Sequence, residues 1–141
     1  MAITFDSENI DFPNIKKRKT SAWMKKIANS YNKKIGEIAY LFCNDEKILE
    51  INRQYLNHDF YTDIISFDYS EGDRISGDIF ISIDTVRTNS QKYNTDYQEE
   101  LYRVIIHGVL HLCGLDDKLK EDAIRMRESE NSALKQLYSN E

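Results

Sequence analysis

The stretch His107-Gly-Val-Leu-His111-Leu-Cys-Gly114-Leu-Asp-Asp117 sets the architecture of this chain. If it is helical, the rings of His107 and His111 project from one face, because residues four apart are neighbours on a helix. Gly114 can then adopt the positive φ that ends a helix and reverses the chain. Asp117 follows this reversal, so we expect its carboxylate to close one metal site with the two imidazoles.

The alternative is that both histidines are ordinary residues of a buried helix. The segment from 98 to 113 is apolar on nearly all sides, which predicts a central helix. Two buried imidazoles there need partners, since an unsatisfied buried polar group costs about 1–3 kcal/mol. A metal satisfies both, and this donor set favours one zinc ion per chain with an open position for water. Nickel or copper can bind the same ligands.

The ligand spacing is also that of a class of zinc proteases, HExxHxxGxxH, with two substitutions. Gly108 stands where those proteases have their glutamate base, and Asp117 stands where they have a third histidine. A glycine can neither accept a proton from water nor deliver one to an amine. A zinc protease is therefore the weakest of the functions compatible with the motif.

Composition predicts one soluble domain spanning residues 1–141. The chain is 40% hydrophobic and 30% charged, and it has a net charge of −5. No apolar run approaches the roughly 20 residues that cross a bilayer, and no signal peptide is evident. We therefore expect a cytoplasmic protein without a membrane partner, in which Cys43 and Cys113 are reduced.

Basic residues are concentrated near the N-terminus. Residues 14–34 carry eight of the 19 basic side chains and no acidic one. Such asymmetry is expected of a phosphate-binding face on an acidic protein, although a solvated helix surface would have the same pattern. The candidate RNA-binding residues are Lys16, Lys17, Arg18, Lys19, Lys25 and Lys26. The negative net charge argues against indiscriminate nucleic-acid binding, and we do not expect DNA as a partner.

Strand-like and helix-like segments alternate along the chain, which predicts an α+β fold, α/β-like and three-layered. A small mixed sheet of about four strands would be packed by helices, with the motif helix buried at the centre. Strands are expected at 3–5, 38–43, in the segment ending at 67, and at 77–83. Helices are expected after the caps Thr20 or Ser21, Asn44 or Asp45, Asp84, and Thr95 or Asp96, with a last helix over about 118–138.

Three motifs resemble those of the YbeY family of bacterial metal-dependent endoribonucleases. The segment 107–117 is similar to the family pattern HGxLHLxGYDH, and Met126 and Glu130 follow it as in the family. The segments 62–67, TDIISF, and 77–79, GDI, resemble the family's TDVLSF and GDI. The order of the three motifs along the chain is also that of the family.

This resemblance implies a zinc-dependent hydrolase that cleaves single-stranded RNA, matures ribosomal RNA and takes part in ribosome quality control. It implies the ligands His107, His111 and Asp117, the last replacing a family histidine, and the small ribosomal subunit as a partner. Leu56 stands where the family has an arginine thought to meet the RNA phosphate. His58 is the nearest cationic candidate for that catalytic role, unless it is an ordinary exposed loop residue. The loss of the arginine leaves a second hypothesis, a non-catalytic ribosome-associated module with a structural zinc.

Overall fold

One mixed sheet organises the computed structural model, which describes residues 2–56 and 62–139. Its strands are β1 (Ala2–Ser7), β2 (Lys34–Cys43), β3 (Ile64–Asp68) and β4 (Arg74–Ser82), in the order β1-β2-β4-β3. β2 pairs in parallel with β1 and β4, whereas β3 pairs antiparallel to β4. The α+β class and the four-stranded mixed sheet expected from the sequence are confirmed.

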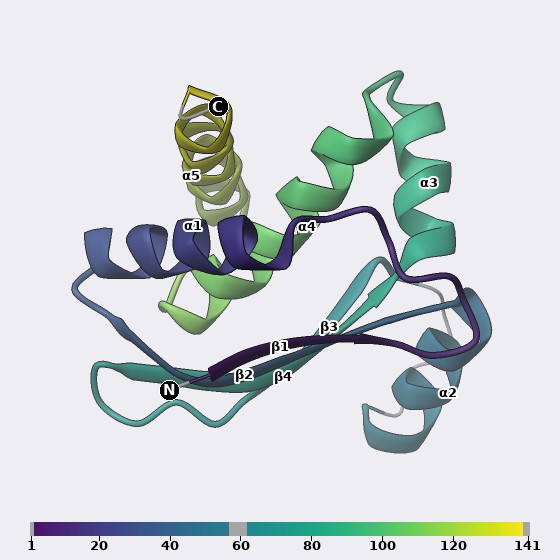
Figure 1. The fold of residues 1–141 in the computed structure, drawn as a ribbon, viewed down its shortest axis with the longest axis horizontal. Helices are drawn as coiled ribbons and strands as arrows, with labels where there is room; N and C mark the ends of the chain where they lie inside the picture. Colours follow the sequence, from purple (N-terminus) through teal and green to yellow (C-terminus); the bar gives the residue numbers. More distant parts are fainter. Residues whose placement is uncertain (1, 57–61, 140–141) are drawn as a thin grey trace.

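Helices cover both faces of this sheet (Figure 1). One face carries α1 (Lys17–Ser30), α3 (Ile83–Lys92), α4 (Tyr97–Leu112) and α5 (Lys120–Ser139), and the other carries α2 (Asp45–Tyr55). Side chains alternate across a strand, so neighbouring residues of β3 face different helices. Ile64 packs with the large core, whereas Ile65 joins a small cluster with Ile48 and Ile51 of α2. The three-layer arrangement follows from this alternation.

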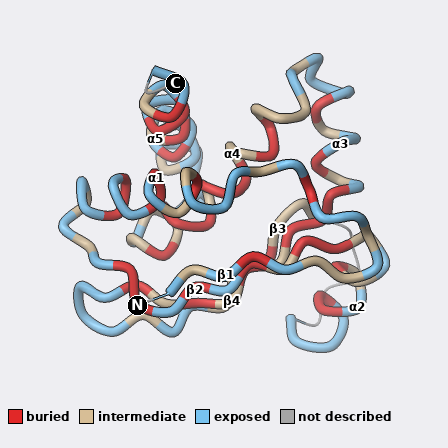
Figure 2. The backbone as a smooth tube through the Cα atoms, viewed as in Figure 1, coloured by how far each residue is buried: buried red, intermediate tan, exposed pale blue. Residues whose placement is uncertain are grey.

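The motif helix α4 is the central helix, as its apolar sequence predicts. Figure 2 shows buried positions along most of its length, and Leu101, Ile105 and Leu110 are fully buried. Gly108 lets the helix lie close to the sheet, because a Cβ atom there would come within 2.8 Å of Ile79 Cδ1. The Tyr40 hydroxyl of β2 donates a 2.7 Å hydrogen bond to the Ile105 carbonyl of α4.

The basic helix α1 is anchored on the body through Trp23. The Trp23 side chain is buried, and its Nε1 donates a 2.8 Å hydrogen bond to the Ala133 carbonyl of α5. The helix begins at Lys17, before the expected caps Thr20 and Ser21, and its N-cap residue makes no side-chain cap bond. The helix therefore starts earlier than its cap-forming residues indicate, and Thr20 and Trp23 are buried within it.

Side-chain caps start α2, α3 and α4 close to where the sequence indicates. Asn44 accepts from the backbone N–H of Lys47 at α2, and Asp96 accepts from that of Glu99 at α4. At α3 the cap is Ser82 rather than the expected Asp84, which lies in the first turn. None of the helices in the described ranges is long and apolar enough to cross a membrane.

Candidate active site

The end of α4 returns the chain toward the two histidines of that helix. Gly114 has a φ of 107°, and its N–H donates to the His111 carbonyl at 3.0 Å. The Leu115 N–H donates to the Leu110 carbonyl at 3.1 Å. These two bonds form a Schellman motif, which reverses the chain after a helix. Asp117 follows immediately and lies beside His107, as the spacing predicts.

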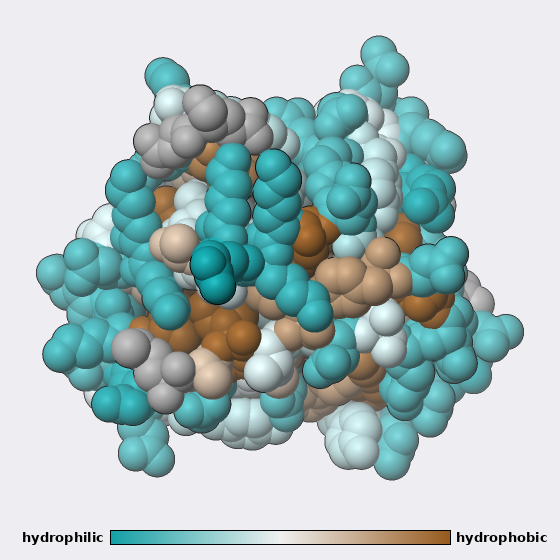
Figure 3. Space-filling view, viewed as in Figure 1, coloured by the Kyte–Doolittle hydropathy of each residue, from teal (hydrophilic) through white to brown (hydrophobic). Residues whose placement is uncertain are grey.

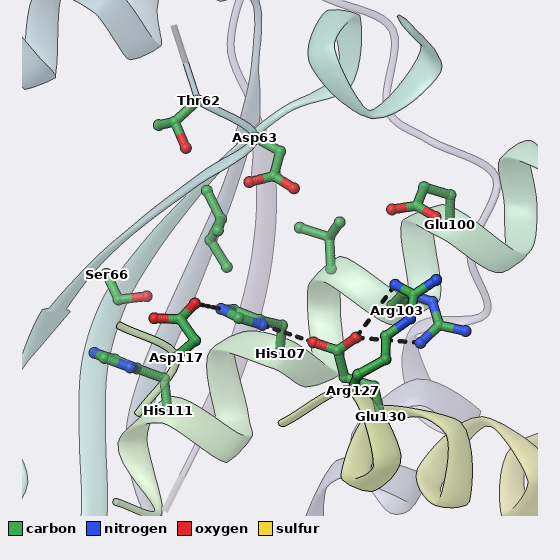
Figure 4. A pocket seen from close by; sticks show the side chains of 12 residues that line it. Thr62, Asp63, Ser66, Glu100, Arg103, His107, His111, Asp117, Arg127 and Glu130 are labelled. Atoms are coloured by element: carbon green, nitrogen blue, oxygen red, sulfur yellow. Dashed lines mark hydrogen bonds and ion pairs between the residues drawn. The ribbon is translucent and has the colours of Figure 1, made fainter. Parts of the chain in front are cut away.

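His107, His111 and Asp117 line one cavity of about 390 Å³. It opens between α4, the start of β3 and α5 (Figure 4). His107 Nε2 lies 3.4 Å from Asp117 Oδ2. Two ligand atoms bound at about 2.0–2.2 Å to a tetrahedral zinc ion are roughly 3.4 Å apart, so this pair has the separation that zinc requires.

His111 lies farther from this pair. In Figure 4 the Asp117 carboxylate is drawn between the two imidazole rings. Across residues 2–56 and 62–139, no three His, Cys, Asp or Glu side chains are grouped closely enough to hold a metal ion. The donor types and the His107–Asp117 spacing therefore fit zinc. Of the three expected ligands, His111 is the one whose ring does not lie with the other two.

Glu130 of α5 connects His107 to two arginines. Its Oε2 lies 2.7 Å from His107 Nδ1, and its Oε1 accepts a 3.1 Å hydrogen bond from Arg103 Nη1. Arg127 Nη1 lies farther away, 3.8 Å from the same Oε1. The carboxylate side chain is only 7% exposed. A carboxylate that binds the far nitrogen of a histidine orients its ring and increases its basicity toward a metal.

Neighbouring carboxylates determine the charge of His107. Burial lowers the pKa of His107, but the hydrogen bond to Glu130 raises it, as do the charges of Glu130, Asp117 and Asp63. The net result is a pKa above the ordinary histidine value. The carboxylates around His107 thus favour a positive charge at this point of the cavity, which either a proton on the imidazole or a bound metal cation can supply.

Two further carboxylates face the cavity. Asp63 lies just before β3, and Glu100 lies on the same face of α4 as His107 (Figure 4). Burial raises the pKa of Asp63. Burial also raises the pKa of Glu100, although the charges of Arg103 and Arg127 offset part of that rise. The cavity is therefore rich in carboxylates, and its two arginines are its only lining lysines or arginines among the described residues.

Asp116 belongs to the turn and not to the cavity. Its Oδ1 accepts from the backbone N–H of Asp117 at 2.7 Å and of Lys118 at 3.3 Å. These bonds hold the pKa of Asp116 below its ordinary value. The side chain is thus committed to the loop backbone, and the cavity lining includes Asp117 alone of this pair.

The candidate RNA-binding residues lie apart from this cavity. None of Lys16, Lys17, Arg18, Lys19, Lys25 and Lys26 lines it. They lie on α1 or at its start, and all but Lys19 are exposed. His58 lies outside the described residues. Leu56, at the end of α2, is 39% exposed and also does not line the cavity.

The sequence reasoning missed the two arginines of the site. Arg103, His107 and His111 are spaced by four residues and therefore share one face of α4. That spacing was a sufficient signal for Arg103. Arg127 and Glu130 are three residues apart on α5, but nothing local to α5 indicates that they face α4.

Comparison with known proteins finds one family that matches nearly the whole chain. A family model described as endoribonuclease YbeY matches residues 3–138. A relative from Bacteroides fragilis with that name is 62% identical over 134 residues, covering 95% of this chain and 96% of the relative. A relative of the same name from Bacteroides thetaiotaomicron is 60% identical over 134 residues, covering 95% of this chain and 98% of the relative. The solution structure of TM1509 from Thermotoga maritima has the same fold, with a TM-score of 0.70, 22% identity and 99% and 91% of the chains covered.

Proposed function

The chain belongs to the YbeY endoribonuclease family, and from that premise we propose that it is a metal-dependent hydrolase of single-stranded RNA. The observation that supports this most directly is the cavity, in which two expected ligands lie at metal-ligand separation beside an orienting carboxylate. Ribosomal RNA is the proposed substrate, the small ribosomal subunit the proposed partner, and ribosome quality control in the cytoplasm the proposed setting.

His107, His111 and Asp117 would hold a zinc ion in this cavity. Bound zinc would lower the pKa of a water ligand toward about 7 and polarise a phosphoryl oxygen. Glu130 would keep the ring of His107 in position through Nδ1, leaving Nε2 to face the cavity. Asp117 is a sound zinc ligand, so its replacement of the family histidine is compatible with the proposal.

Arg127 would bind the RNA phosphate. The Arg127 side chain lines the cavity, is 58% exposed and makes only a long contact with Glu130. The Arg103 side chain, by contrast, is 12% exposed and lies close to Glu130. A guanidinium can bind two phosphate oxygens at once, which positions the phosphodiester. Basic residues of α1, such as Lys25 and Lys26, would bind the RNA backbone farther from the cleaved bond.

A structural zinc is less compatible with the cavity. Structural zinc sites are closed by four protein ligands, whereas catalytic sites have three ligands and an open position. Asp116 is the adjacent candidate for a fourth ligand, but its side chain is hydrogen-bonded to its own turn. Protease activity is also disfavoured, because position 108 faces Ile79 and Tyr40 of the sheet rather than the cavity.

Metal analysis combined with an RNA cleavage assay tests this proposal. We expect near one zinc per chain in the wild type, together with cleavage of single-stranded ribosomal RNA. The variant His111→Ala should retain its circular dichroism spectrum and lose cleavage. Bound metal without any cleavage by the wild type would instead favour the non-catalytic ribosome-associated module.

A further inference from the structure

A row of surface depressions leads away from the candidate active site along α5. Arg103 lines both the active-site cavity and a depression of about 210 Å³ that also includes Lys135 and Tyr138. Tyr138 in turn lines a third depression of about 280 Å³ with Lys16 and Tyr102. Because neighbouring depressions share a wall residue, they adjoin one another between the site and α1.

The charge of the lining changes along this row. The active-site cavity is lined by four carboxylates, those of Asp63, Glu100, Asp117 and Glu130. The second depression has one acidic residue, Glu99, beside Arg103 and Lys135, and the third has Lys16 and Lys19 with no acidic residue. Carboxylates thus outnumber the arginines in the active-site cavity, whereas basic residues predominate in the two outer depressions, where a polyanion is attracted.

Aromatic side chains accompany these cations. Tyr138 is 37% exposed and Tyr102 is half-buried, with its ring edge-to-face against Trp23 at 5.9 Å between centroids. The space-filling view shows hydrophilic side chains over α1 with apolar surface between them (Figure 3). Cations that follow a backbone, combined with aromatic faces for bases, are the features by which proteins bind single-stranded nucleic acid without reading its sequence.

We propose that single-stranded RNA leaving the active-site cavity runs along α5 past Lys135 and Tyr138 to Lys16, the residue just before α1. From Arg127 to Tyr138 the helix extends for about 16 Å, at 1.5 Å per residue, which is room for several nucleotides. This path connects the basic N-terminal segment to a site that it does not itself line. The inference rests on the proposed function, because it takes RNA as the substrate of the cavity.

The test compares Lys135→Gln with Lys92→Gln, a variant of equal charge. Lys92 ends α3 and lines none of the three depressions. Binding of a fluorescent single-stranded RNA is measured by anisotropy over a range of salt concentrations, with a chelator present to prevent cleavage. The logarithm of the association constant falls linearly with the logarithm of the salt concentration. Loss of one phosphate contact should make this line less steep by about 0.7 in Lys135→Gln. Lys92→Gln should retain the wild-type slope, and thermal melts should show both variants folded.

Cleavage kinetics separate this inference from the proposed function. Lys135→Gln should raise KM for a long RNA and leave KM unchanged for a trinucleotide, which occupies only the cavity. If the wild type cleaves RNA and the two variants behave alike, the path along α5 is wrong and the nuclease function stands. If the wild type binds RNA with the expected loss in Lys135→Gln but cleaves none, the path stands and the nuclease function fails. A wild type that does not bind RNA overturns both.

Discussion

His107 Nδ1 of α4 lies 2.7 Å from Glu130 Oε2 of α5, so that a buried carboxylate from one helix orients an imidazole of another. The other imidazole nitrogen, Nε2, lies 3.4 Å from Asp117. One ring is thereby held between an orienting group and a prospective co-ligand. Glu130 also binds Arg103, so the same carboxylate contributes to both the site and the packing of α5 on α4.

Glu130→Gln should weaken zinc binding about 10–100-fold, the usual cost of losing an outer group behind a metal-bound histidine. The amide retains the shape of the side chain but not its charge, so the His107 ring becomes less basic. Competition with a chromophoric chelator measures the affinity. Glu128→Gln, an exposed neighbour on α5, is the matched control. Equal affinities in the two variants would exclude the orienting role.

Glu130→Ala should lower the free energy of unfolding of the metal-free protein by about 3–5 kcal/mol. The reason is that Arg103, only 12% exposed, would keep a buried charge without its partner. Urea denaturation measures the change, and Glu128→Ala should stay within about 0.5 kcal/mol of the wild type. A loss below about 1 kcal/mol for Glu130→Ala would show that Arg103 finds another partner or water.

Asp117→Ala should reduce zinc affinity more than Glu130→Gln does, because it removes a ligand atom rather than the group behind one. Asp116→Asn is the matched control, since its amide oxygen can still accept the turn hydrogen bonds from Asp117 and Lys118. Its affinity should equal that of the wild type. A larger loss in Asp116→Asn than in Asp117→Ala would reverse the assignment of the two carboxylates.

The thiol of Cys43 should resist alkylation at pH 8 in the folded protein. Burial, with a smaller effect of the Glu8 charge, raises its pKa from 9.0 to about 12, so the reactive thiolate is about a thousandfold rarer. Because only the neutral thiol is favoured in this buried position, the free energy of unfolding should fall as the pH rises from about 9 toward about 12. Mass spectrometry after iodoacetamide treatment tests the prediction, with urea-unfolded protein as the positive control. Rapid modification of Cys43 in the native protein would contradict it.

Local spacing was enough to predict the motif helix, its reversal and the approach of Asp117 to His107. Apolar residues on nearly all sides of 98–113 indicated a buried helix, and the interval between His107 and Asp117 is one that a helix and one Schellman turn convert into proximity. The ring of His111 is not brought to the same point. The sheet was predictable for the same reason, because strand-like and helix-like segments alternate along the chain. These inferences depend only on interactions within about ten residues.

Tertiary structure alone decided what surrounds those ligands. Glu130 is 23 residues from His107 in sequence, and the two meet because the apolar residues of α5, among them Met126 and Ala133, pack in the core together with α4. Packing of Trp23 against α5 likewise places the basic helix beside the path over Lys135 rather than at the cavity. A helical period specifies which face of each helix is apolar, but not which polar residues meet when two such faces come together, since that depends on the angle and register of the packed helices.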